Sequence, residues 1–259
     1  MPFALITGAS KGIGRSIAKE LAARKIDVLL VARTENLLKE LAVELKNQYG
    51  VEAHYLAIDL GQPYTAKKIY EWCDEKKYGI NILVNNAGYG LSGDFEKYSS
   101  SDYVDMMQVN IIAPMELILL FLPELKKQNK SYILNIGSSA AYQAVPFLSM
   151  YAASKAFIVS FSRALKYELR KTNVSVTLVS PGTTLTGFSE RADVPEKAIK
   201  TGEKISMTAD QVARIAVKSL FKERTEVITG FITKLTVFLV WLLPKKLTER
   251  TGAGFYKKP

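Results

Sequence analysis

Cysteine and histidine, two residue types that often bind transition metals, are almost missing from this chain of 259 residues. Cys73 and His54 are the only members of their types, so no internal disulfide can form and no zinc-ligand spacing can be written. A magnesium site built from carboxylates is not excluded by this shortage. A single thiol favours the reducing cytosol, and we therefore expect a cytoplasmic protein without a metal site.

The first residues lack the features of a secretory leader, since no basic region or cleavage site accompanies the apolar run from Phe3 to Ile6. Acidic residues are also outnumbered, because 35 Lys and Arg against 25 Asp and Glu give a net charge of +10. A charge of this sign suits nucleic acid, an anionic membrane or an anionic ligand. The cations are spread along the chain without a nucleic-acid-binding motif, so we expect no nucleic-acid partner.

Apolar residues make up 48% of the chain and form short, nearly continuous runs that alternate with longer amphipathic segments. The short runs indicate buried strands and the longer segments indicate helices, which predicts a parallel sheet covered on both faces. No linker or repeat divides the chain, so residues 1–259 are expected to form a single α/β domain with a doubly wound, seven-stranded sheet. The expected strands are 3–7, 28–31, 52–58, 81–85, 131–136, 174–180 and 225–229, and the expected helices are 13–23, 35–49, 63–77, 101–127, 150–170 and 208–222.

Two segments stand outside this alternation. Residues 183–207 read as a loop with some helix, and we expect this loop to contact the substrate. Residues 231–259 form a C-terminal extension that opens with an apolar helical stretch, 231–243, interrupted only by Lys234. The stretch is too short to span a bilayer, which takes about 20 residues. Three interpretations stay open: a core or subunit-contact helix, a lid over an apolar pocket, and a shallow membrane contact.

Glycines recur at positions 8, 12 and 14, between the first expected strand and the first expected helix. Glycine permits a tight turn and a close approach of the backbone to a pyrophosphate, while the helix N-terminus supplies free N–H groups. The same spacing is compatible with a purely structural turn. Its position after a strand at the start of the fold favours a dinucleotide-binding loop.

The end of the second expected strand bears on the choice of cofactor. An Asp or Glu there would bind the ribose hydroxyls of NAD, whereas this chain has Val31-Ala32-Arg33-Thr34. Arg33 and Lys11 can both face a 2′-phosphate, so NADP(H) is favoured over NAD(H). The alternative is that both side chains are solvated surface cations.

A Tyr-x-x-x-Lys spacing places a phenol and an ammonium on one helix face, where the cation is expected to lower the pKa of the phenol from about 10. Tyr151 begins its expected helix just beyond the strand that ends at Asn135-Ile136-Gly137-Ser138-Ser139, and parallel sheets bind their ligands beyond the strand ends, whereas Tyr64 begins a surface helix and Tyr167 lies at the far end of a long helix. We therefore expect the Tyr151/Lys155 pair to be catalytic, with Ser138 or Ser139 hydrogen-bonded to the substrate oxygen. The other pairs with this spacing are Tyr64/Lys68 and Tyr167/Lys171.

Taken in order, these motifs resemble the short-chain dehydrogenase/reductase family over about residues 3 to 230. The resemblance implies a Rossmann fold and hydride transfer between a nicotinamide and a small carbonyl or alcohol substrate. The motifs that carry the resemblance are Thr7-Gly8-x-x-x-Gly12-x-Gly14, Asp59-Leu60, Asn85-Asn86-Ala87-Gly88, Asn110, Ser138, Tyr151-x-x-x-Lys155 and Pro181-Gly182-x-x-x-Thr186.

The resemblance implies a role for each matching residue. Tyr151 is expected to donate the proton in reduction, Lys155 to lower the pKa of Tyr151 and hold the nicotinamide ribose, and Ser138 to bind the substrate oxygen. Asn110 completes the expected catalytic set by anchoring a water in the proton relay. Asp59 is expected to contact the adenine. The expected cofactor-binding residues are Gly8, Ser10, Lys11, Gly12, Ile13, Gly14, Arg33, Asp59, Leu60, Asn86, Ala87, Gly88, Tyr151, Lys155, Pro181, Gly182, Thr184 and Thr186, the last at the carboxamide.

One local feature supports Asn110 independently of the resemblance. Pro114 lies four residues later in the same expected helix and has no N–H to donate to the carbonyl of Asn110. That carbonyl is then free to accept a hydrogen bond from water. The alternative is that the proline simply kinks the helix for packing.

Gln143, Phe147, Met150 and Phe188 flank the catalytic motifs and are expected to line a partly apolar substrate pocket. In this the chain resembles family members that act on hydrophobic carbonyls such as 3-oxoacyl or steroid-like compounds. The all-round apolar character of residues 111–122, together with the helix expected at 150–170, predicts a homodimer or homotetramer. A non-catalytic NADP(H)-binding redox sensor is the alternative function, but a sensor need not retain all four expected catalytic residues.

Overall fold

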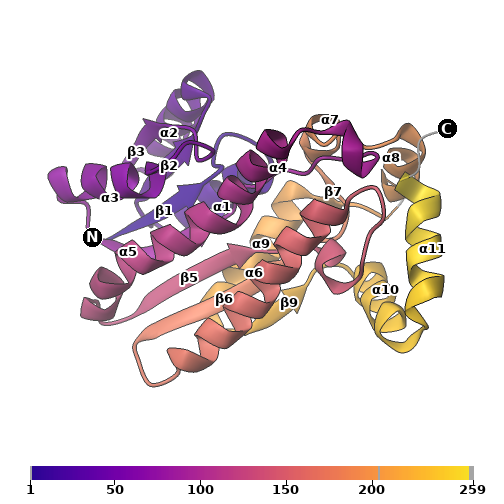
Figure 1. Cartoon of the computed structure of the whole chain (residues 1–259). Helices are drawn as coiled ribbons and strands as arrows, with labels where there is room; N and C mark the ends of the chain where they lie inside the picture. Colours follow the sequence, from indigo (N-terminus) through magenta and orange to yellow (C-terminus); the bar gives the residue numbers. More distant parts are fainter. Residues whose placement is uncertain (1, 204, 257–259) are drawn as a thin grey trace.

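Seven parallel strands form one sheet, as the sequence predicts, and the structure gives their order as β3-β2-β1-β4-β5-β6-β9 (Figure 1). The computed structural model describes residues 2–203 and 205–256. Five of the strands are buried along their whole length or nearly so, as expected for a sheet covered on both faces. The strands are β1 (Phe3–Thr7), β2 (Val28–Ala32), β3 (Ala53–Ala57), β4 (Ile80–Asn85), β5 (Ser131–Ile136), β6 (Val174–Ser180) and β9 (Glu226–Ile228).

Helices cover both faces of the sheet and create two apolar cores (Figure 1). One face is covered by α1 (Gly12–Ala22), α2 (Glu35–Tyr49) and α9 (Ala209–Phe221), where α1 packs directly against α9. The other face is covered by α3 (Thr65–Glu75), α5 (Ala113–Lys127) and α6 (Ser149–Glu168). The doubly wound α/β prediction is therefore confirmed.

The chain reverses its direction of travel across the sheet between β1 and β4, which are hydrogen-bonded neighbours. Ligands of open α/β sheets bind in the crevice at such a switch point, beyond the carboxyl ends of the strands. The loop after β1 and the first turn of α1 hold the three glycines, and residues 86–88 follow β4. The topology therefore brings these two motifs to one edge of the sheet.

The helix expected at 101–127 is not continuous. It consists of α4 (Ser100–Met107), a π-helical turn over Gln108–Ile112 (η2) and α5, and the Ala113 N–H donates to the Gln108 carbonyl five residues back. The wider turn lies directly before Pro114, which cannot donate to the carbonyl four residues earlier. The stretch from Ser100 to Lys127 is long and apolar enough to span a membrane by length and composition, but α5 packs its apolar side into the sheet core.

The expected loop at 183–207 contains short elements, in agreement with the sequence interpretation. Strand β7 (Thr184–Leu185) pairs in parallel with β8 (Met207–Thr208), and two short helices lie between them. The remaining elements are η1 (Phe95–Lys97), η3 (Ser139–Tyr142), α7 (Phe188–Arg191), α8 (Glu196–Glu203), α10 (Phe231–Leu242) and α11 (Lys245–Tyr256).

Helix α10 is not the core helix that one interpretation of the sequence predicted. Val240 is its one buried residue, whereas Phe231 is 80% exposed and Trp241 is 74% exposed. The helix lies at the periphery of the fold beside α11 (Figure 1). Its exposed apolar side chains therefore need an explanation other than packing within this chain.

Candidate active site

The three glycines after β1 form a cradle that side chains would fill. A Cβ on Gly14 would lie 2.3 Å from the Gly8 carbonyl oxygen and 2.4 Å from Asn86 Nδ2. Gly8 and Gly12 adopt φ values of +66° and +54°, which favour glycine. Lys11 precedes α1 without a side-chain capping bond, so the first N–H groups of α1 are free of a side-chain cap. This glycine cradle fits the phosphates of a dinucleotide.

The cradle is hydrogen-bonded to the segment after β4. Asn86 Nδ2 donates to the carbonyls of Thr7 and Gly8, at 2.9 and 3.2 Å. The Thr7 hydroxyl accepts from the N–H groups of Asn86 and Ala87 and donates to Val84. These bonds hold the two loops at the switch point in one fixed arrangement, which places Asn86 and Ala87 beside the glycines as expected.

Arg33, at the end of β2, lies beside Asp59, with 3.8 Å between Nη1 and Oδ2. Both side chains are about half exposed, so this ion pair contributes little to stability. Asp59 Oδ1 also accepts a hydrogen bond from the Gly61 N–H, while Leu60 is buried in the core. Arg33 therefore lies beside Asp59, the residue that is expected to contact the adenine of the cofactor.

The segment after β6 closes the other side of the cradle. A Cβ on Gly12 would lie 3.0 Å from Thr186 Cγ2, so Thr186 contacts the glycine loop. The Pro181 carbonyl accepts a hydrogen bond from Ser139, and Gly182 packs tightly against Thr233 of α10. The Thr184 hydroxyl donates a local hydrogen bond to the Gly182 carbonyl, at 3.0 Å.

Tyr151 and Lys155 both lie buried in the first turns of α6, near the ends of β4 and β5. Lys155 Nζ donates to the Ile136 carbonyl at 3.0 Å and lies 5.9 Å from the centre of the Tyr151 ring. Burial lowers the pKa of Lys155 to about 8. The side chain can reach the cleft between the catalytic residues and the cofactor cradle, since a Cβ on Gly88 would lie 3.2 Å from its Nζ.

The pKa of Tyr151 does not follow the sequence prediction. Burial raises it to about 12, although a hydrogen bond with the Ser138 side chain acts to lower it. Lys155 is not among the groups that shift this pKa, and its ammonium donates to the Ile136 carbonyl. A raised pKa keeps the phenol protonated at neutral pH, the state that a proton donor needs.

Ser138 lies at the end of β5 and is the serine that meets Tyr151, as the resemblance implies. Its hydroxyl also accepts a hydrogen bond from the Ala140 N–H at 3.1 Å, which begins η3. Ser139 is turned into that short helix, and its N–H donates to the Pro181 carbonyl. Of the two serines, Ser138 is therefore the one whose side chain interacts with the phenol, and its role toward the substrate oxygen stays a prediction.

Asn110 is buried in the π-helical turn and makes three side-chain hydrogen bonds. Oδ1 accepts from the Tyr89 N–H at 3.1 Å, and Nδ2 donates to the Tyr89 carbonyl at 2.9 Å and to Ser154 Oγ at 3.0 Å. Ser154 in turn donates to the Tyr151 carbonyl at 2.7 Å. Asn110 therefore joins the segment after β4 to the first turn of α6. The expected role for its carbonyl stays a prediction.

Apolar rings surround the phenol of Tyr151. The Phe188 ring lies 5.1 Å from the Tyr151 ring, and Tyr256 of α11 packs in the same cluster. Met150 belongs to this cluster too. Phe147 adopts a φ of 63°, and its carbonyl accepts from the Gly93 N–H. Gln143 ends η3, and no contact of its side chain to Tyr151 is seen among the described residues.

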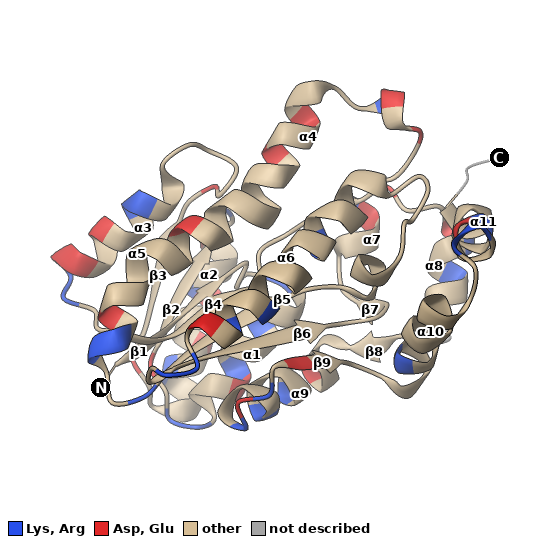
Figure 2. Cartoon of the chain, turned by 60° about the horizontal axis from the view of Figure 1, so that its bottom comes forward, with Lys and Arg blue, Asp and Glu red and all other residues tan. Residues whose placement is uncertain are grey.

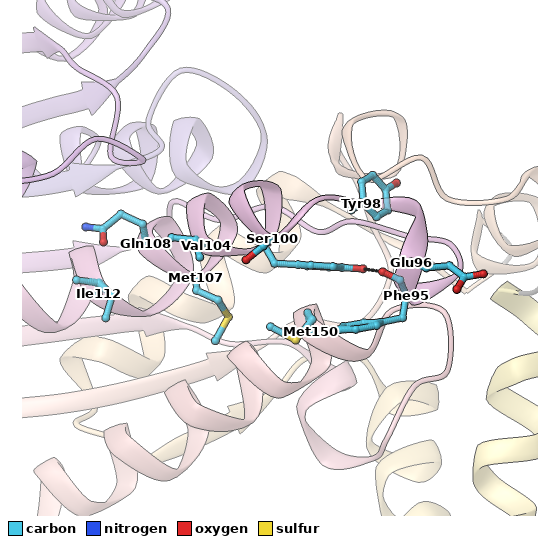
Figure 3. A pocket seen from close by; sticks show the side chains of 10 residues that line it. Phe95, Glu96, Tyr98, Ser100, Val104, Met107, Gln108, Ile112 and Met150 are labelled. Carbon is cyan, nitrogen blue, oxygen red and sulfur yellow. Dashed lines mark hydrogen bonds between the residues drawn. The ribbon is translucent and has the colours of Figure 1, made fainter.

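A cavity of about 530 Å³ lies near this site, between η1, α4 and the start of α6 (Figure 3). Figure 3 shows Met107 and Met150 approaching one another at its wall, with Phe95 beside them. None of the four expected catalytic residues lines this cavity. It is therefore an apolar neighbour of the candidate active site, and Met150 is the expected substrate residue that lines it.

Several residues that build the site were missed by the sequence reasoning. Tyr89 and Ser154 form hydrogen bonds with Asn110. Each is adjacent in the sequence to a residue of a recognised motif, and this adjacency is the signal by which they could have been predicted. Arg191 stacks on the Tyr89 ring at 3.9 Å, and burial, with a smaller effect of Arg33, lowers its pKa. Tyr256 comes from the far end of the chain and carries no such signal.

This site and the strand order define a dinucleotide-dependent oxidoreductase with a tyrosine beside its cofactor cleft. The model of the short chain dehydrogenase family matches residues 2–197. The chain is 32% identical to a ketoacyl reductase, HetN, of Nostoc sp., over 93% of this chain and 84% of that protein. The chain therefore belongs to the short-chain dehydrogenase family.

Solved structures agree with this membership. A 7beta-hydroxysteroid dehydrogenase has a TM-score of 0.87 and 25% identity, covering 97% of this chain and 96% of its own. A short-chain dehydrogenase from Sphingobium yanoikuyae in complex with NADPH has a TM-score of 0.77 and 31% identity, covering 88% and 87%. A fold neighbour from Burkholderia phymatum is in complex with NAD, so the fold alone does not choose between the two cofactors.

Proposed function

We propose that this protein is an NADP(H)-dependent reductase of hydrophobic carbonyl compounds, acting on 3-oxoacyl or steroid-like substrates. The observation that carries the proposal is the phenol of Tyr151, which is buried, hydrogen-bonded to Ser138 and part of an apolar cluster that includes Phe188. The Tyr151 ring lies against Gly90 and 5.9 Å from Lys155 Nζ, which in turn lies beside Gly88, so the proton donor is close to the segment after β4 that is expected to bind the cofactor.

In the proposed reaction a bound nicotinamide supplies a hydride to the carbonyl carbon. Ser138 orients the carbonyl oxygen, and Tyr151 donates its proton to that oxygen as negative charge develops. Lys155 holds the ribose next to the phenol. Asn110 acts as a positioning residue, because its hydrogen bonds hold the first turn of α6 against the segment after β4.

The substrate class is supported by the composition of the site. Phe188, Met150 and Tyr256 gather around the phenol, and a polar substrate would leave its own polar groups unpaired against such side chains. The ketoacyl and hydroxysteroid activities of the relatives point the same way. The test measures NADPH oxidation with short ketones, 3-oxoacyl thioesters, steroids and quinones. Turnover confined to short polar ketones would overturn the substrate class, and NADPH binding without turnover would favour the redox sensor.

The cofactor preference rests on Arg33. The residue offers a guanidinium where an acidic side chain would select NAD, and its pair with Asp59 is long and half exposed, so a 2′-phosphate can compete for it. We expect Arg33→Asp to weaken NADPH binding by about tenfold or more, since a charge-assisted hydrogen bond contributes roughly 1.5–3 kcal/mol. NADH binding should be unchanged or stronger. Fluorescence titration of both cofactors measures this, and equal NADPH affinity in the variant would refute the assignment.

We also propose that two copies associate through α5 and α6. Leu119 on α5 is 67% exposed and Phe157 on α6 is 42% exposed, on helices that are otherwise packed on the sheet. We expect light scattering at micromolar concentration to give at least a dimer. The double variant Leu119→Arg/Phe157→Arg should be a monomer with an unchanged melting temperature. A monomeric parent chain would contradict this proposal.

A further inference from the structure

The largest gathering of exposed apolar side chains lies on the last two helices. Ten of the nineteen large apolar side chains that the described residues expose come from positions 231–255. Single exposed apolar residues are ordinary, but a contiguous group on one element marks an interaction site. These residues belong neither to the cofactor cradle nor to the cluster around Tyr151.

Helix α10 is apolar on nearly every side, with Lys234 as its one charged residue. Its inner side presents Val240 and the partly buried Val237 to the fold. The opposite side carries the apolar face of α10, which we define as Phe231, Leu235, Phe238 and Leu242, at spacings of four, three and four residues. All four side chains are between 46% and 80% exposed.

Cations border this face and anions are scarce. Lys234 is exposed on α10 itself, and Lys245, Lys246 and Arg250 are exposed on α11. Figure 2 shows the α10 ribbon uncharged along nearly all its length, with basic positions on the neighbouring α11. Glu249 is the single acidic residue between positions 231 and 256. Apolar and aromatic side chains edged by lysines are typical of helices that lie in a membrane interface.

We propose that the apolar face of α10 docks on the surface of an anionic lipid bilayer. The helix has 12 residues, fewer than the roughly 20 that a membrane span needs, so it lies along the interface. Trp241, 74% exposed at the side of the face, is placed for the headgroup region, where indole rings are enriched. The cations beside it meet the negative lipid headgroups.

Charge favours a bilayer over a second copy of this chain on the same face. A two-fold contact places the same patch on both sides, so the lysines of one copy would face those of the other. Such a contact gathers like charges without the acidic residues that would balance them. An anionic bilayer offers the complementary charge.

Docking here would place the active site beside the lipid. Helix α10 packs against η3, which follows Ser138, and its Thr233 lies against Gly182 at the end of β6. A hydrophobic carbonyl dissolved in the membrane would then reach the site over a short distance. This consequence rests on the proposed function, whereas the docking itself does not.

The test uses the full chain in a Trp72→Phe background, which leaves Trp241 as the only tryptophan. Vesicles of phosphatidylcholine with 30% phosphatidylglycerol are expected to co-sediment the protein and shift the Trp241 emission to the blue. The variant Leu235→Gln/Phe238→Gln/Leu242→Gln should bind at least about 30-fold more weakly, because three apolar side chains no longer enter the interface. Lys245→Gln/Lys246→Gln should weaken binding by about tenfold.

The controls separate the other outcomes. Val43→Gln/Tyr64→Gln changes two exposed apolar residues elsewhere and should bind vesicles like the parent chain. Equal binding to pure phosphatidylcholine vesicles, or full binding by the α10 triple variant, would overturn the proposal. So would a dimer in light scattering that the triple variant dissociates, because a second copy would then cover the face. None of these readouts depends on turnover, so a failed docking test leaves the proposed function standing.

Discussion

Tyr151→Phe is expected to lower kcat for carbonyl reduction by roughly 10²–10⁴-fold, the range that a positioned general acid usually contributes. The substitution removes one oxygen and leaves the ring, so the contacts with Phe188 and the rest of the cluster persist. NADPH binding should be retained, because the glycine cradle and Lys155 are untouched. Steady-state kinetics with the best carbonyl of the panel, beside a fluorescence titration of NADPH, measures both quantities.

The matched control is Tyr167→Phe, which alters the exposed tyrosine of a second Tyr-x-x-x-Lys pair on the same helix. It should leave kcat unchanged. If Tyr151→Phe retained the parent's kcat, proton donation by this phenol would be excluded. If it lost NADPH binding as well, the residue would serve the cofactor, and the assigned chemistry would need another donor.

The sequence was sufficient for the parts of this site that local patterns determine. The order of strands and helices along the chain follows from apolar periodicity. The glycines at positions 8, 12 and 14 predict the tight turn after the first strand, where the backbone conformation and close packing require glycine. The choice of Tyr151 among three similar pairs also follows from position, since Tyr151 lies in the first turn of α6, whereas Tyr167 lies at the far end of the same helix and Tyr64 precedes α3, which follows the edge strand β3.

Features that depend on tertiary packing could not be predicted. The pKa of Tyr151 depends mainly on burial, which spacing along a helix does not give. Tyr256 reaches the cluster because α11 folds back across the site, a long-range contact without a local signal. The exposure of α10 could not be predicted either, because an apolar helix has the same sequence pattern whether it packs in the core or lies on the surface.

Asn110→Leu is expected to destabilise the fold and to disable the site together. Leucine has a similar shape, but it leaves the part-buried N–H and carbonyl of Tyr89 without their partner, and the buried Ser154 loses a donor. Unsatisfied buried groups cost about 1–3 kcal/mol each, so we expect a total loss of about 2–5 kcal/mol. For a chain of this size the melting temperature should fall by roughly 5–15 °C, as calorimetry would record.

The effect on catalysis should come from disorder between α6 and the segment after β4, so kcat should fall together with the melting temperature. Ser154→Ala is the matched variant, because it removes one of the three hydrogen bonds and keeps both bonds to Tyr89. It should lower the melting temperature by less. If Asn110 acted only through its main-chain carbonyl, as Pro114 alone would suggest, Asn110→Leu would keep both kcat and the melting temperature. The two variants therefore distinguish a side chain that positions the catalytic helix from a backbone group that holds a water.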